Sequence, residues 1–213
     1  FQMVPFGRLF NMALSLDGTT GIISANIQDG TITGSDIASS TITASNIASS
    51  TITPAKLAQP LTLGTAVAIS GNPTSVDFNS IPSWAKRITV TFDNVSTSGT
   101  STVQIQIGSG SYSTSGYTAG AAYLAGAAQN SASATSGFVS YTVPAASTQS
   151  GSIVLTLLSS NIWTCMGILV SGTELNYFAG VSPSLSGALD RVRITTVNGT
   201  DTFDAGTVNI MYE

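Results

Sequence analysis

The chain has 213 residues, a net charge of −4 and only 8% charged residues, six of them Lys or Arg. No cluster of basic residues would neutralise a run of phosphates, which argues against nucleic-acid binding, and no apolar run reaches the roughly 18 residues of a membrane span. The sequence has no histidine, which excludes the Ser-His-Asp and Cys-His catalytic arrangements and removes the commonest transition-metal ligand. We therefore expect no enzyme activity, no metal and no cofactor.

The first segment, residues 1–21, precedes any regular pattern. Phe1–Asn11 lacks the cationic stretch and long apolar run of a signal peptide. We predict that residues 1–21 form an N-terminal attachment segment.

Residues 22–60 are repetitive. Three decamers stand in a row at 27–36, 37–46 and 47–56, and each contains Thr-Ile-Thr. A strand has a side-chain period of two and a helix of 3.6, so neither keeps residues spaced by five on one side. The pattern predicts short β-segments with bends between them, which return one apolar side chain each time to a common axis. These axial residues are Ile22, Ile27, Ile32, Ile37, Ile42, Ile47, Ile52 and Leu57.

A single chain cannot stabilise such a segment, because eight apolar side chains offset only part of the backbone entropy lost on ordering it. Backbone pairing must then be shared between chains. The pattern predicts a thin β-shaft of more than one chain, which ends near Pro54 and Pro60.

From Leu61 onward the period changes to two, which is typical of half-buried strands. Asn198-Gly199 predicts a two-residue hairpin, and Gly108–Ser136 is expected to be a long loop. Cys165, the only cysteine, is expected to be buried. Many short strands without a helical stretch predict an antiparallel β-sandwich head over residues 61–213. The alternating apolar positions are Ile88, Val90 and Phe92; Val103, Ile105 and Ile107; Val139, Tyr141 and Val143; Ile153, Leu155 and Leu157; Val192 and Ile194; and Val208, Ile210 and Tyr212.

Two regions resemble a known family. The Thr-Ile-Thr decamers are similar to the repeats of phage tail-fibre shafts, which form intertwined trimers. The stretch from Ile81 to Ile107 and the ending Leu189–Tyr212 resemble the C-terminal domain of phage and prophage tail fibres. Ala13–Ile22 also resembles the opening of some phage structural proteins, in which case Met12 is the natural start.

This resemblance implies a fold and a function. The fold is all-β, an intertwined trimeric β-shaft followed by an antiparallel β-sandwich, jelly-roll-like head. The function is that of a receptor-binding protein of the virion, located in the phage tail and made in the host cytoplasm. Its partners would be two further copies of the chain, other tail or baseplate proteins bound through the N-terminus, and a host cell-surface glycan, without membrane insertion.

Aromatic rings on loops stack on sugar faces, and neighbouring amides bind hydroxyls. Core packing or contact between subunits is the alternative for each ring and is favoured for Tyr117, whereas Trp84 is expected to anchor the core. The candidate receptor-binding residues are Tyr112, Tyr117, Tyr123, Asn130, Trp163 and Tyr177.

Three other functions remain open. A tail-borne polysaccharide depolymerase needs two carboxylates facing each other across a cleft, and Asp190, Asp201 and Asp204 are close enough in sequence to be considered. A purely structural virion fibre would have a head without a groove carrying exposed aromatics. A trimeric bacterial adhesin is the weakest alternative.

Overall fold

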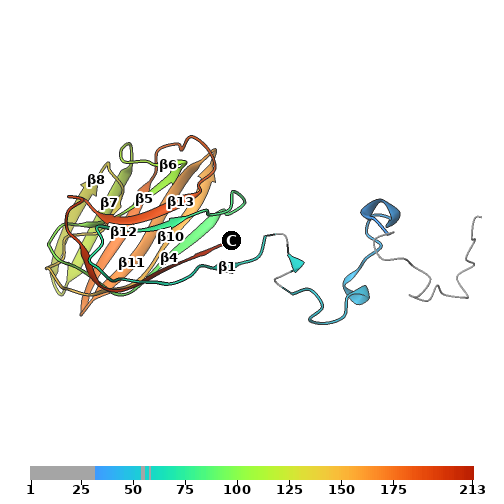
Figure 1. Ribbon diagram of the computed structural model, residues 1–213, viewed down its shortest axis with the longest axis horizontal. Coiled ribbons are helices and arrows are strands. Elements are labelled where there is room, and N and C mark those ends of the chain that lie inside the picture. The colour runs from blue at the N-terminus through green and yellow to red at the C-terminus, as the bar shows by residue number, and fades with distance from the viewer. Residues whose placement is uncertain (1–31, 54–55, 58) are drawn as a thin grey trace, which may run out of the picture. The chain divides into compact units, whose positions relative to one another are not determined.

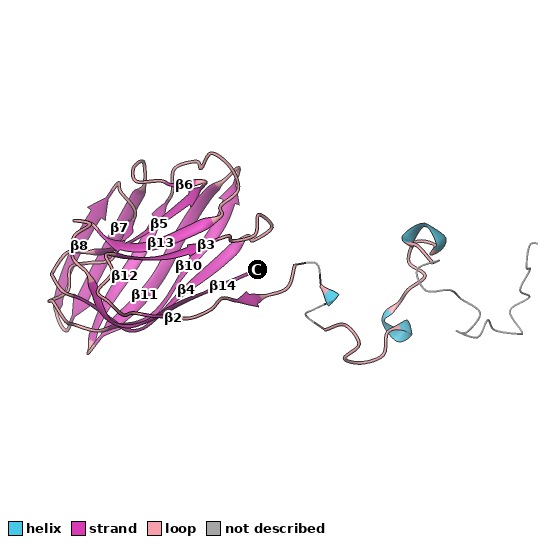
Figure 2. Cartoon of the chain, viewed as in Figure 1, coloured by secondary structure: helices cyan, strands magenta, loops and turns pink. Residues whose placement is uncertain are grey.

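The computed structural model describes residues 32–53, 56–57 and 59–213. The chain divides into two units, Phe1–Ile52 and Thr53–Glu213, which are described separately. Every strand pairing among the described residues is antiparallel. The prediction of an all-β fold is therefore confirmed, and Figure 2 shows the strands in magenta.

In the described repeats, residues 32–53, the local structure consists of turns, and the predicted short β-segments are absent. Two 3₁₀ turns, Gly34–Asp36 and Ala44–Asn46, lie one decamer apart. Thr33 caps the first turn, because its backbone N–H and its hydroxyl both donate to the Asp36 carboxylate, at 2.8 and 2.7 Å. A capping side chain three residues away satisfies groups that a strand partner would otherwise satisfy.

The second decamer repeats this geometry. The backbone N–H and hydroxyl of Thr43 donate to Asn46 Oδ1 at 2.9 and 2.7 Å. Ser40 and Ser50 both adopt a left-handed backbone, with φ of 63° and 62°. The ten-residue sequence period is therefore also a ten-residue structural period, built on Thr-x-x-Asp/Asn.

The described axial residues are all exposed within the single chain. Ile32, Ile42 and Ile52 are 57, 56 and 54% exposed, while Ile37 and Ile47 are 40% exposed. Leu57, in the second unit, is 50% exposed. Ile22 and Ile27 lie outside the described residues, as does the predicted attachment segment 1–21. The placement of all these apolar residues on a trimer axis stays a prediction.

The second unit contains two sheets (Figure 1). The larger runs in the order β1-β14-β4-β10-β11-β12-β7-β8, with β2 also on β14, and the smaller runs β3-β13-β5-β6, with β9 also on β5. The larger sheet contains β1 (Thr62–Leu63), β2 (Val67–Ala68), β4 (Arg87–Thr97), β7 (Thr118–Ala125), β8 (Ala128–Ala134), β10 (Gln149–Ser159), β11 (Ile162–Ser171), β12 (Glu174–Val181) and β14 (Phe203–Tyr212). The smaller contains β3 (Ser75–Asn79), β5 (Val103–Ser109), β6 (Ser111–Tyr112), β9 (Phe138–Val139) and β13 (Arg191–Thr196).

Both sheets contribute to one hydrophobic core. Ile88 and Leu155 of the larger sheet and Ile105 and Ile194 of the smaller are each 0% exposed and belong to the same cluster. Each lies two residues from another core residue on the same strand, which reproduces the period of two seen in the sequence. Cys165 is buried as predicted, and burial raises the pKa of its thiol. Trp84 is partly buried, packed against this core with its ring 5.7 Å from that of Tyr212.

Three predictions about local structure differ from what the structure shows. Asn198-Gly199 is a turn, but β13 and β14 on either side of it belong to different sheets, so it does not close a hairpin. The segment Gly108–Ser136 is largely strand, comprising β6 and the hairpin β7–β8. The alternation predicted around Val139–Val143 gives only the two-residue strand β9.

Candidate functional site

The outer face of the smaller sheet carries mostly polar side chains on its three longest strands, β3, β13 and β5. Strand register places Ser75, Thr195 and Gln104 in one row and Asp77, Arg193 and Gln106 in the next. These residues alternate with core residues on each strand, so the sequence directs them away from the core. They form a surface of hydroxyl, amide and guanidinium groups, with the Asp77 carboxylate paired to Arg193.

A groove of about 480 Å³ lies over this face, which we call the polar groove. It is built from the sheet, the turn after β13 and two segments that flank β7–β8. Its lining residues are Thr74, Ser75, Gln104, Gln106, Thr114, Ser136, Arg193, Thr195, Thr196, Val197, Asn198 and Gly199.

Hydrogen bonds fix the floor of the polar groove. Gln104 and Gln106 are only 3 and 6% exposed. The Gln104 amide donates to the Thr196 carbonyl at 3.2 Å, and Ser136 Oγ donates to Gln104 Oε1 at 2.9 Å. Gln106 donates to the Ser136 carbonyl at 3.0 Å. Side chains held in this way are pre-organised, so a ligand need not order them.

The turn at the edge of the polar groove is equally well fixed. Asn198 Oδ1 accepts hydrogen bonds from the backbone N–H groups of Thr200 and Asp201, both at 3.0 Å. Asn198 Nδ2 donates to Asp201 at 2.8 Å, and this bond, followed by one from the Ser101 N–H, lowers the pKa of the Asp201 carboxyl. Gly199 has φ of +69°, in the left-handed region that favours glycine.

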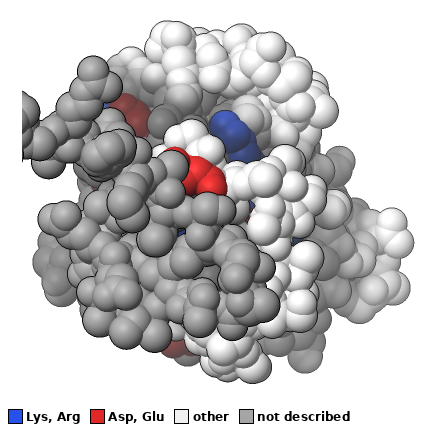
Figure 3. Space-filling model, turned by 90° about the vertical axis from the view of Figure 1, so that its right-hand side faces the viewer, with Lys and Arg blue, Asp and Glu red and all other residues white. Residues whose placement is uncertain are grey.

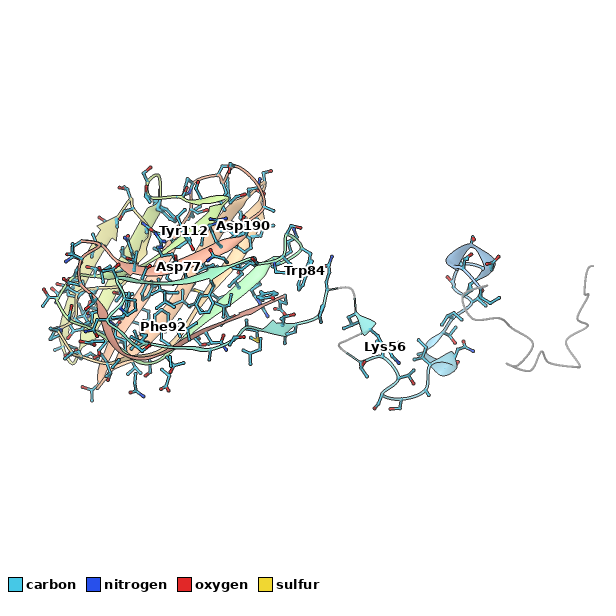
Figure 4. All side chains as sticks on the ribbon, in the orientation of Figure 1. Lys56, Asp77, Trp84, Phe92, Tyr112 and Asp190 are labelled. Atoms are coloured by element: carbon cyan, nitrogen blue, oxygen red, sulfur yellow. The ribbon has the colours of Figure 1, made fainter. Side chains whose placement is uncertain are left out.

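Beside the groove lies a charged cluster around Tyr112 (Figure 4). Arg193 donates two bonds to Asp77, at 2.8 and 2.7 Å, and its guanidinium lies 4.1 Å from the centre of the Tyr112 ring. The Tyr112 hydroxyl donates to Asn79 at 3.0 Å. Burial, and then the Asp77 charge, raise the pKa of Tyr112. Arg191 pairs with Asp190 at 2.7 Å, which lowers the pKa of that carboxyl.

The predicted receptor-binding residues do not converge on one site. Tyr112 borders the polar groove. Tyr177 lies on β12 between two buried residues, so its side chain points to the outer face of the larger sheet, away from the core. Tyr123 and Asn130, paired across β7 and β8, line a separate recess of about 510 Å³. The Tyr123 ring stacks on Tyr141 at 5.2 Å.

Two of these residues are core residues. Tyr117 and Trp163 are each 2% exposed, so their prediction as receptor contacts is wrong and the alternative, core packing, is confirmed for both. Tyr117 packs edge-on against Phe138 at 5.0 Å, and its hydroxyl accepts a bond from the Ile107 N–H at 2.9 Å. A buried ring of this kind cannot stack on a sugar.

Sequence reasoning missed Gln104, Gln106 and Thr195. A signal was present, since Gln104 and Gln106 alternate with Val103, Ile105 and Ile107. That alternation places them on the outer face but does not say that β13, far along the chain, lies beside β5.

The polar groove presents hydrogen-bonding groups from side chains and backbone. Arg193 is its one charged lining residue, and none of the lining residues is a carboxylate. In the described part of the chain, no group of His, Cys, Asp or Glu is arranged to hold a metal ion, and no helix is long and apolar enough to cross a membrane. Where Figure 3 leaves described residues in view, most of their atoms belong to uncharged residues, drawn white. No family model, curated protein or solved structure matches this chain.

Proposed function

We propose that the chain is a homotrimeric phage tail-fibre protein whose head binds a glycan of the host bacterial surface through the polar groove. In this proposal the repeats form the intertwined shaft, and the unit Thr53–Glu213 forms a β-sandwich, jelly-roll-like head. The observation that carries it is a rigid groove lined by hydroxyls and fixed amides, because such groups bind the hydroxyls of sugars.

The position of the groove supports this proposal. Leu63 of β1, near the start of the second unit, lines a recess together with Asn79 at one end of β3. The polar groove lies beside Thr74 and Ser75, at the other end of the same strand. A ligand there would bind away from the place where the chain enters this unit.

The exposed isoleucines support the trimer. The isoleucines of the described repeats recur every five residues and are exposed by 40–57%, and packing against other copies of the chain would remove them from water. The resemblance of the decamers to tail-fibre shafts supplies the number three.

Hydrolysis is less well supported than binding. A depolymerase needs two carboxylates about 5–9.5 Å apart across its substrate, and the lining of the polar groove contains none. A purely structural fibre is favoured by one observation, the lack of an aromatic residue among the same lining residues.

The test is binding of labelled full-length protein to arrays of bacterial surface polysaccharides. Thr114→Phe fills the groove from an exposed loop, and Thr173→Phe is the matched control, an exposed threonine in the turn between β11 and β12. We expect binding to at least one polysaccharide, weakened at least tenfold by Thr114→Phe only. Absence of binding across the array favours the structural fibre, and release of new reducing ends favours the depolymerase.

A further inference from the structure

The outer face of the larger sheet carries an apolar surface that the polar groove does not use. It lies on β10, β11, β12 and β7, on the side opposite the core. Met166 is 74% exposed, Ile168 43%, Val170 39% and Val181 37%. We call this surface the outer apolar face.

Strand register makes these side chains neighbours. Ile168 of β11 lies between Ser152 of β10 and Tyr177 of β12. Tyr177 in turn faces Ala122 of β7. Residues directly opposite one another on adjacent strands have Cβ atoms about 5 Å apart, so the apolar side chains are neighbours from β11 through β12 to β7, and Ser152 of β10 borders them.

The outer apolar face carries no charged side chain from these four strands. Their only charged residue is Glu174, the first residue of β12. Glu174 and Asn176 are two residues apart on the same strand, so their side chains point to the same side of the sheet. Asn176 is fully buried, so Glu174 lies on the core side and not on the outer apolar face. There it accepts a hydrogen bond from Tyr123 and so raises the pKa of that phenol.

We propose that the outer apolar face is the surface through which the heads of different copies of this chain pack against one another. This inference rests on the proposed trimer, and it assigns a contact in the head that is separate from the repeats. An uncharged face suits contact with identical copies, because identical charges brought together would repel.

The size of the face fits this occupant. The exposed parts of its four large apolar side chains amount to roughly 350 Å² per copy, within the range of about 300–600 Å² for a monomer's largest apolar patch, which is often functional. A standard interface removes about 800 Å² per partner. The small and polar residues that border the face, such as Ala122, Ala179 and Ser152, supply the remainder and allow close approach.

The test compares wild-type full-length protein with Ile168→Glu and a matched control, Ser111→Glu. Ile168 lies on the outer apolar face and Ser111 on the smaller sheet, and both are exposed. Met166 is a native probe, since hydrogen peroxide oxidises exposed methionines faster than covered ones. Each variant is analysed by sedimentation and by mass spectrometry of the Met166 peptide.

In wild type and Ser111→Glu we expect a trimer with slow Met166 oxidation. In Ile168→Glu we expect oxidation at least ten times faster, whether the repeats still hold the trimer or it dissociates. Ile168→Thr, which keeps the branched Cβ suited to a strand, should raise the rate by a smaller factor. Circular dichroism verifies that each variant is folded.

The outcomes separate this inference from the proposed function. A wild-type trimer in which Met166 oxidises as fast as in Ile168→Glu overturns the inference and leaves the trimeric fibre intact. A wild-type chain that sediments as a monomer at every concentration overturns both.

Discussion

The hydroxyl of Tyr117 occupies a gap along the edge of β5, and its removal has a calculable effect. It accepts a hydrogen bond from the Ile107 N–H at 2.9 Å and donates to the Ser113 carbonyl at 3.2 Å. On this side, β9 pairs with β5 only at Gln104 and Ile105, and β6 pairs only at Gly108 and Ser109. The phenol therefore replaces a missing strand partner.

Tyr117→Phe keeps the ring against Phe138 but leaves the Ile107 N–H buried without its acceptor. An unsatisfied buried donor costs about 1–3 kcal/mol. For a unit of this size, 1 kcal/mol corresponds to about 2–4 °C, so we expect the melting temperature to fall by roughly 2–12 °C at pH 7. Circular dichroism measures this directly.

The same substitution changes the response to alkali. Burial raises the pKa of Tyr117 from 10.0 to about 12, so the phenol ionises more readily in the unfolded chain. The contribution of the neutral phenol to the free energy of unfolding is complete below pH 10. It is lost as the pH rises towards 12, a decrease of about 3 kcal/mol. In Tyr117→Phe the free energy of unfolding should not show this decrease at alkaline pH, because the ring has no hydroxyl to ionise. A Tyr117→Phe variant with the wild-type melting temperature at pH 7 and also the wild-type decrease in the free energy of unfolding at alkaline pH would refute this reasoning.

Three further predictions concern assembly, the core and binding. Ile42→Asp would bring three carboxylates together at an apolar axis, so sedimentation should show a weakened trimer, and an unchanged one would mean that Ile42 faces outward. Asn176 is 0% exposed and neither atom of its amide has a partner among the described residues, so Asn176→Leu should raise the free energy of unfolding by about 1–2 kcal/mol, and a decrease in denaturant melts would contradict this. Tyr112→Ala removes the ring that lies against Arg193 of the polar groove and should weaken binding to host cells without loss of the trimer, whereas Tyr123→Ala, in the separate recess, should leave binding unchanged; unchanged binding in Tyr112→Ala would place the site elsewhere, and dissociation would make that ring an interface residue.

The parts of the fold that the sequence predicts are those set by local periodicity. The alternation of Ile88, Val90 and Phe92 correctly places them in β4 with their side chains in the core. In the repeats, the five-residue spacing identifies the apolar side chains that are exposed in the single chain. The local backbone, however, depends on Thr33 and Asp36, whose capping hydrogen bonds favour a turn over a strand.

The parts of the fold that the sequence does not predict depend on pairing between strands that are far apart in the chain. Asn198-Gly199 has the composition of a hairpin turn, yet β13 pairs with β3 and β5, so the chain leaves one sheet for the other at this point. Tyr117 has the sequence neighbours of an exposed loop residue, and only the gap along β5 explains its burial. The polar groove was missed for the same reason, because its rows join strands that are distant in sequence.

The most direct test of the trimeric fibre is the mass of the intact chain in solution. Sedimentation equilibrium of the full-length protein should give three times the chain mass of 21.6 kDa, over a concentration range wide enough to detect dissociation. A mass of one chain throughout that range would contradict the shaft, the packing of heads through the outer apolar face and the proposal of a trimeric fibre together.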